Sequence, residues 1–117
     1  MTRIPIDLAA PIACTASRDD LHDRIAQLER LRDRLRSVDR TEQGLVLHLE
    51  PGSDVRAALE RFVADEKGCC QFWGFEICDG PDLTLRWEGP PAVQSLLDEL
   101  ADCFRSGEPL HPLAGLL

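Results

Sequence analysis

One segment, Gly44-Leu45-Val46-Leu47-His48-Leu49-Glu50-Pro51-Gly52-Ser53-Asp54, sets the architecture expected for this chain. Every second residue from 45 to 49 is a leucine, which is the pattern of a strand with one buried face. The Pro51-Gly52 pair ends that strand, and Ser53 or Asp54 then supplies a side chain that caps a helix at its amino end. The segment therefore predicts a strand that passes directly into a helix.

The helix that follows carries apolar residues at steps of three and four positions. They are Val55, Leu59, Phe62 and Val63. The same spacing continues to Glu66 and Cys70, so a helix of that length places a carboxylate and a sulfur on the buried face. Gly68 is the alternative terminator, and Cys69 and Cys70 would then lie in the turn beyond the helix.

The remaining elements are predicted from the same two spacings of apolar residues, two positions for a strand and three to four for a helix. Alternation predicts strands over 72–78 and 83–87, and Asp79-Gly80-Pro81-Asp82 forms the hairpin between them. Helical spacing predicts a first helix over about 18–37 and a third over 90–107. The order α-β-α-β-β-α predicts an α+β fold, a two-layer sandwich in which helices cover a three-stranded sheet.

We expect residues 1–117 to form a single domain. Residues 1–16 contain two prolines and no clear period, and are read as an extended arm that leads Cys14 toward the body of the domain. The α+β core spans 17–107. The apolar, proline-containing tail 108–117 is expected to dock on the domain or on a second copy, which would make a homodimer.

Composition excludes several classes of protein. An apolar fraction of 44% and a charged fraction of 29% are those of a globular domain. Thirteen basic and 21 acidic residues give a net charge of −8, which argues against nucleic acid as a partner. No apolar run is long enough to span a bilayer, and the amino end lacks the unbroken apolar segment of a secretory signal. We therefore expect a cytoplasmic protein without a membrane partner.

The chemistry concentrates in Asp65-Glu66-Lys67-Gly68-Cys69-Cys70-Gln71-Phe72-Trp73, where a helical pattern gives way to a strand pattern. An odd count of five cysteines, two of them adjacent, argues against a disulfide framework and for a vicinal dithiol. Thiolates bind soft ions such as Hg(II), As(III), Cu(I) or Zn(II), although Zn(II) sites usually use separated Cys pairs. We expect a metal site made by Cys69, Cys70 and Cys14, with the identity of the ion left open.

Two motifs resemble a family of small, uncharacterised bacterial proteins associated loosely with heavy-metal resistance genes. The motifs are Ile12-Ala13-Cys14-Thr15 and Phe62-Val63-Ala64-x-Glu66-x-x-Cys69-Cys70-x-Phe72, and the resemblance covers about residues 10–105. It carries no assigned activity. It implies that Cys14, Glu66, Cys69, Cys70 and Phe72 belong together.

Three functions compete on this sequence. The first is a binding module that sequesters, delivers or senses a soft ion through the three cysteines. The second is an enzyme in which two thiolates grip an organometallic substrate while Glu66, or Asp65, donates a proton to the leaving carbon. The third is a structural or interaction protein, in which Cys69 and Cys70 are small buried apolar residues and the molecule forms a homodimer.

Overall fold

A computed structural model describes residues 2–11 and 18–107 of the chain. Over these residues it has a five-stranded sheet in the order β1-β4-β5-β3-β2, in which every neighbouring pair is antiparallel. The strands are β1 (Thr2–Ile4), β2 (Leu35–Arg40), β3 (Gly44–Leu49), β4 (Gly74–Cys78) and β5 (Leu83–Glu88). The helices are α1 (Arg18–Arg32), α2 (Ser53–Cys69) and α3 (Gln94–Ser106), the last preceded by a 3₁₀ turn η1 (Pro91–Val93).

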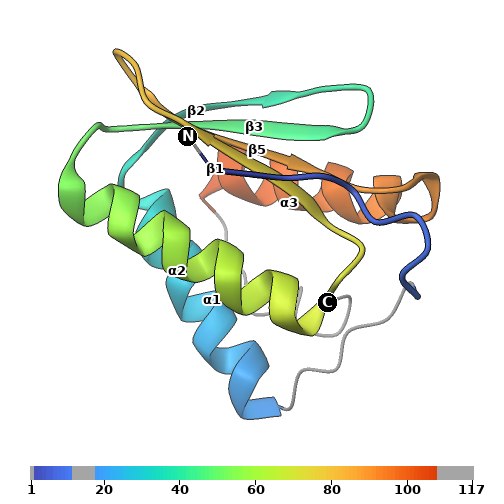
Figure 1. Ribbon diagram of the computed structural model, residues 1–117. Coiled ribbons are helices and arrows are strands. Elements are labelled where there is room, and N and C mark those ends of the chain that lie inside the picture. Colours follow the sequence, from blue (N-terminus) through green and yellow to red (C-terminus); the bar gives the residue numbers. More distant parts are fainter. Residues whose placement is uncertain (1, 12–17, 108–117) are drawn as a thin grey trace.

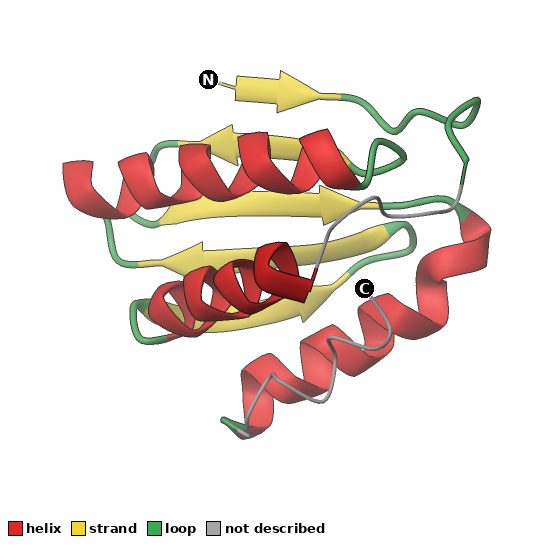
Figure 2. Ribbon diagram, turned by 90° about the horizontal axis from the view of Figure 1, so that it is seen from below, coloured by secondary structure: helices red, strands yellow, loops and turns green. Residues whose placement is uncertain are grey.

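The helices all lie on the same side of the sheet, below it in Figure 1. Figure 2 views the molecule from that helical side, with the strands behind the helices. The expected α+β fold with a layer of helices on a layer of sheet is therefore confirmed. The expected three strands are too few, because β1 and β2 add one strand at each edge.

The first helix is shorter than predicted. It ends at Arg32 rather than near 37, and Leu35 begins β2. A change of register between Leu35 and Ser37 places an irregularity in the pairing of β2 with β3. In a regular strand, residues three positions apart point to opposite faces, but a bulge between them brings both to the same face. Leu35 and Val38 therefore both contact the core. Their spacing of three residues is also typical of a helix.

The amino-terminal arm is also more structured than expected. Residues Thr2–Ile4 pair with β4, in a register that sets Arg3 opposite Glu76. The chain then continues alongside the start of β4, where a Cβ added to Gly74 would lie 2.7 Å from the backbone nitrogen of Ile6. Glycine at this position therefore permits the close approach of the two segments.

The segment 44–88 largely matches its prediction. α2 runs without a break to Cys69, so Gly68 is a helical residue and not the terminator. The helix begins after Gly52 with no side-chain cap, so the expected capping by Ser53 or Asp54 is wrong. β4 begins two positions later than the predicted strand, and β5 ends one position later than predicted.

The core lies between the sheet and the helices. Its centre is an aromatic cluster in which Phe62 of α2 packs against Phe75 and Trp87, at ring-centroid distances of 6.1 and 5.3 Å. Trp73 joins the cluster through Trp87 at 5.3 Å. All four rings are buried, and each such side chain contributes about 1.5–3 kcal/mol by leaving water. The cluster therefore fixes the middle of α2 and the start of β4 relative to the sheet.

Two sequence predictions fall on positions that the structure does not describe. Cys14 and the tail 108–117 lie outside the described residues. Within the described part of the chain, no helix is both long enough and apolar enough to cross a membrane.

Candidate functional site

The site is built on the last turn of α2 and the loop that leads to β4. Glu66 continues the apolar face of α2 and is buried. The helix closes when the Cys70 backbone N–H donates to the Glu66 carbonyl oxygen at 2.7 Å. Lys67 then ties down the loop, because its Nζ donates to the carbonyl oxygens of Gln71 and, at 2.7 Å, of Trp73.

A buried ion pair joins this turn to α1. Arg24 Nη1 donates to Glu66 Oε1 at 2.7 Å, and the two side chains are only 6% and 4% exposed. Arg24 Nη2 also donates to Cys69 Sγ at 3.5 Å. One guanidinium therefore contacts both the acid and the first of the two adjacent sulfurs.

Burial and charge act in opposite directions on this pair. Burial raises the pKa of Glu66, and the attraction of Arg24 together with the nearby Trp73 indole offsets that rise only in part. For Arg24, burial lowers the pKa, but the hydrogen bond to Cys69 and the attraction of Glu66 outweigh it and the pKa lies above its ordinary value. The guanidinium is therefore a fixed positive charge, and Glu66 holds a proton more tightly than an exposed glutamate does.

Three polar atoms around the pair are buried and have no hydrogen-bond partner within the described segments. They are Arg24 Nε, Glu66 Oε2 and Trp73 Nε1. The indole lies near enough to favour the charged form of Glu66, but not in the geometry of a hydrogen bond. Buried polar atoms usually have a hydrogen-bond partner. Arg24 Nε and Trp73 Nε1 can each donate a further hydrogen bond, and Glu66 Oε2 can accept one.

The two adjacent sulfurs differ in their surroundings and their oxidation state. Cys69 is half-buried and carries a thiol, whereas Cys70 is 1% exposed and disulfide-bonded. The expected dithiol therefore exists only after that disulfide is reduced. Among residues 2–11 and 18–107, no group of three or more His, Cys, Asp or Glu side chains is arranged to hold a metal ion. The third expected ligand, Cys14, falls outside those ranges.

The structure brings together Glu66, Cys69 and Cys70, and adds Arg24, which the sequence analysis missed, and Trp73, which lies in the quoted segment but was given no role there. Arg24 lies three positions after Leu21 and four before Leu28, so it occupies the apolar stripe of α1. An arginine at such a position is a detectable signal of a buried partner, although it is easily lost among the many charges of this helix. Trp73 gave no comparable signal, because its burial fits a core role equally well.

No protein-family model matches the chain, and neither the curated proteins nor the solved structures contain a significant match. The function is therefore inferred from the site itself.

Proposed function

We propose that the protein binds a soft metal or metalloid ion through Cys69 and Cys70 in their reduced state. The observation that carries this proposal is the contact of 3.5 Å between Arg24 Nη2 and Cys69 Sγ. It holds a guanidinium against the first of two adjacent sulfurs.

Arg24 places a hydrogen-bond donor beside the first sulfur of the site. Metal ligation uses the thiolate form of cysteine, so binding is expected to weaken as pH falls. Glu66 keeps the guanidinium in place through the 2.7 Å ion pair. Because both partners are buried, solvent screens their attraction less than it screens a surface pair.

Two sulfurs suit a two-coordinate ion such as Hg(II), and thiolates favour soft ions in general. A three-coordinate ion such as As(III) requires one more ligand, for which Cys14 is the proposed residue.

The test is an ultraviolet titration of protein that has been reduced and then freed of reductant. We expect Hg(II), As(III) or Cu(I) to produce a sulfur-to-metal charge-transfer band that saturates at about one ion per chain. The Cys69→Ser/Cys70→Ser variant should lose the band. Cys78→Ser/Cys103→Ser is the matched control, since it removes two thiols that lie on β4 and α3, and it should retain the band. An unchanged band in the Cys69/Cys70 variant refutes the proposal.

Glu66 favours a second candidate function, the cleavage of a carbon–metal bond. Its pKa is raised by burial, and Glu66 and Cys70 are neighbours through the hydrogen bond that closes α2. In such a reaction the carbon–metal bond breaks, the carbon takes the proton of Glu66, and the metal stays on the two thiolates. The discriminating measurement is hydrocarbon released from an organomercurial. Glu66→Gln should abolish that release and leave the Hg(II) band intact.

A further inference from the structure

The unpartnered polar atoms beside the cysteine site form a matched set. They are the donors Arg24 Nε and Trp73 Nε1 and the acceptor Glu66 Oε2. The side chains of Arg24 and Glu66 are only 6% and 4% exposed, and Trp73 is fully buried. A hydroxyl group accepts through two lone pairs and donates through one hydrogen. Two buried donors and one buried acceptor are therefore complementary to one hydroxyl.

These three atoms surround the sulfur of Cys69 and the carboxylate beside it. Nε and Nη2 share one edge of the planar Arg24 guanidinium, and Nη2 donates to Cys69 Sγ at 3.5 Å. Nη1 donates to Glu66 Oε1 at 2.7 Å, so the second oxygen of the same carboxylate is also close to the guanidinium. Burial raises the pKa of Glu66, and the Trp73 indole is among the groups that oppose the rise, so its N–H also lies near this carboxylate.

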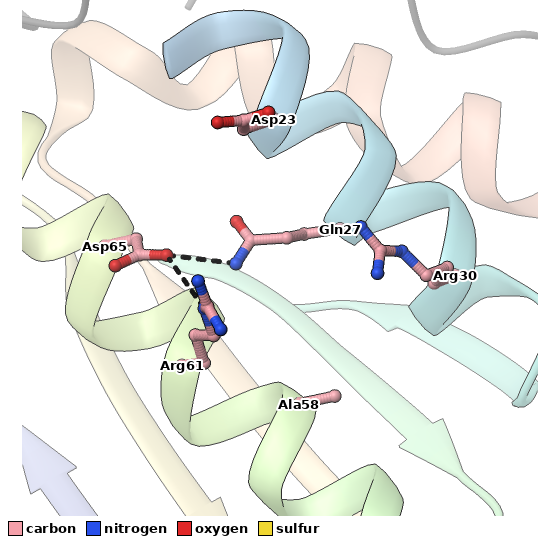
Figure 3. A pocket seen from close by; sticks show the side chains of 6 residues that line it. All are labelled: Asp23, Gln27, Arg30, Ala58, Arg61 and Asp65. Atoms are coloured by element: carbon pink, nitrogen blue, oxygen red, sulfur yellow. Dashed lines mark hydrogen bonds and ion pairs between the residues drawn. The ribbon is translucent and has the colours of Figure 1, made fainter.

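A second contact between α1 and α2 holds the helices together at the same level. Gln27 Nε2 donates to Asp65 Oδ2 at 3.0 Å, and Figure 3 shows the two side chains pointing toward each other from facing helices. Gln27 lies three residues after Arg24 on α1. Asp65 directly precedes Glu66 on α2. The same turns are therefore linked twice, and donors that are fixed before a ligand arrives lose less freedom when it binds.

We infer that the ion bound by Cys69 and Cys70 is a trivalent metalloid that enters as its hydroxide, of the class of arsenous acid. Two arsenic–sulfur bonds form and two arsenic–oxygen bonds break, and each thiol proton leaves with a hydroxide as water. Arsenic stays trivalent and keeps its third hydroxyl. That hydroxyl accepts from Arg24 Nε and Trp73 Nε1 and donates to Glu66 Oε2.

This inference rests on the proposed function, because the reduced cysteines must first bind the ion. It narrows the class of ion that the site takes. A two-coordinate ion such as Hg(II) has no third position and leaves the three polar atoms without a partner, whereas a metalloid hydroxide supplies one. Where Cys14 acts as the third ligand, its thiol displaces the last hydroxyl as a further water, so the hydroxyl is held before that step.

The test compares arsenous acid with methylarsonous acid, in which a methyl group replaces one hydroxyl. After two thiols bind, the first compound keeps a hydroxyl and the second keeps only the methyl group. Both are titrated by ultraviolet absorbance into reduced Cys14→Ser protein, in which the thiol of Cys14 does not compete. Trp73→Phe in this background removes the indole N–H, and should weaken arsenous acid about three- to tenfold and leave methylarsonous acid unchanged.

Trp87→Phe is the matched control. Trp87 is also 0% exposed with an Nε1 that has no described partner, but it lies on β5, so its replacement should change neither affinity. Arg24→Lys is a second, independent variant. It keeps a positive charge for Glu66 and removes the Nε–H, and it should also weaken arsenous acid more than methylarsonous acid.

Equal losses for the two arsenicals, or no loss in either variant, overturn the inference and assign the three atoms to a buried water. Hg(II) separates this outcome from failure of the proposed function. If Hg(II) and both arsenicals bind through Cys69 and Cys70 but Trp73→Phe does not discriminate between the arsenicals, only the hydroxyl site is rejected. If neither Hg(II) nor an arsenical binds the reduced protein, the proposed function is rejected and this inference with it.

Discussion

Replacement of Arg24 by methionine should destabilise the protein in a manner that depends on pH. The change leaves Glu66, whose side chain is 4% exposed, without its charged partner. Removing one member of a buried pair costs about 3–5 kcal/mol, well above the roughly 0–1 kcal/mol of a surface pair. Folded domains are stable by only about 5–15 kcal/mol, so the loss is readily measured.

The sign of the pH dependence follows from Glu66. Burial already raises its pKa above the ordinary 4.5, and Arg24 is the main influence that opposes the rise. Without Arg24 the folded state binds the proton more tightly than the unfolded state does. The free energy of unfolding therefore falls as pH rises from 4.5 through the folded-state pKa. We expect the full cost at about pH 8 and a smaller one, of about 1–3 kcal/mol, at about pH 5.

Urea unfolding followed by tryptophan fluorescence provides the measurement, because Trp73 and Trp87 are both 0% exposed in the folded state. Arg24→Met/Glu66→Leu is the matched control. It removes both charges and should recover most of the lost stability at about pH 8. A cost below about 1 kcal/mol at both pH values, or a double variant no more stable than the single one, refutes a buried and coupled pair.

Three other substitutions test the packing around the site. Gly44→Ala places a Cβ 1.9 Å from the Trp87 carbonyl oxygen and should lower the free energy of unfolding by about 1–3 kcal/mol. Gly68→Ala places a Cβ with no atom within 4 Å on a helix and should raise the free energy of unfolding by about 1 kcal/mol. Thermal unfolding followed by circular dichroism compares the two variants. Phe62→Ala should cost about 3–5 kcal/mol in urea unfolding, because the ring is 0% exposed, and a cost near zero would contradict its central place in the core. Lys67→Met removes the donor to two loop carbonyls and should cost about 1 kcal/mol. Faster amide exchange confined to residues 70–73 would confirm that role, and unchanged exchange would refute it.

Local patterns predicted the parts of the fold in which a single period runs uninterrupted. The α2 stripe and the β4–β5 hairpin belong to this class, because every apolar position there faces the core. The boundary of α1 could not be predicted in this way. Leu35 and Val38 lie three positions apart, and only the bulge in β2 makes that spacing compatible with a strand. The bulge depends on pairing with β3, which a local pattern does not contain.

The candidate site could be predicted only in part, because one of its contacts joins residues that are far apart in the sequence. Glu66 and Cys70 follow from the helical period of α2, and both are buried, Glu66 within the helix and Cys70 just beyond its end. Arg24 is 42 residues from Glu66 in the chain, so only the packing of α1 against α2 brings them together. That packing lets the Arg24 guanidinium donate to both the Glu66 carboxylate and the Cys69 sulfur.

The pairing of β1 with β4 has a practical consequence for handling the protein. Among the described residues, Thr2–Ile4 form the strand that pairs with the outer edge of β4, and an exposed strand edge is a template for adding another chain. A recombinant version trimmed at its amino end should associate into oligomers through that edge. A purification tag fused there would likewise compete with the native strand for its place in the sheet.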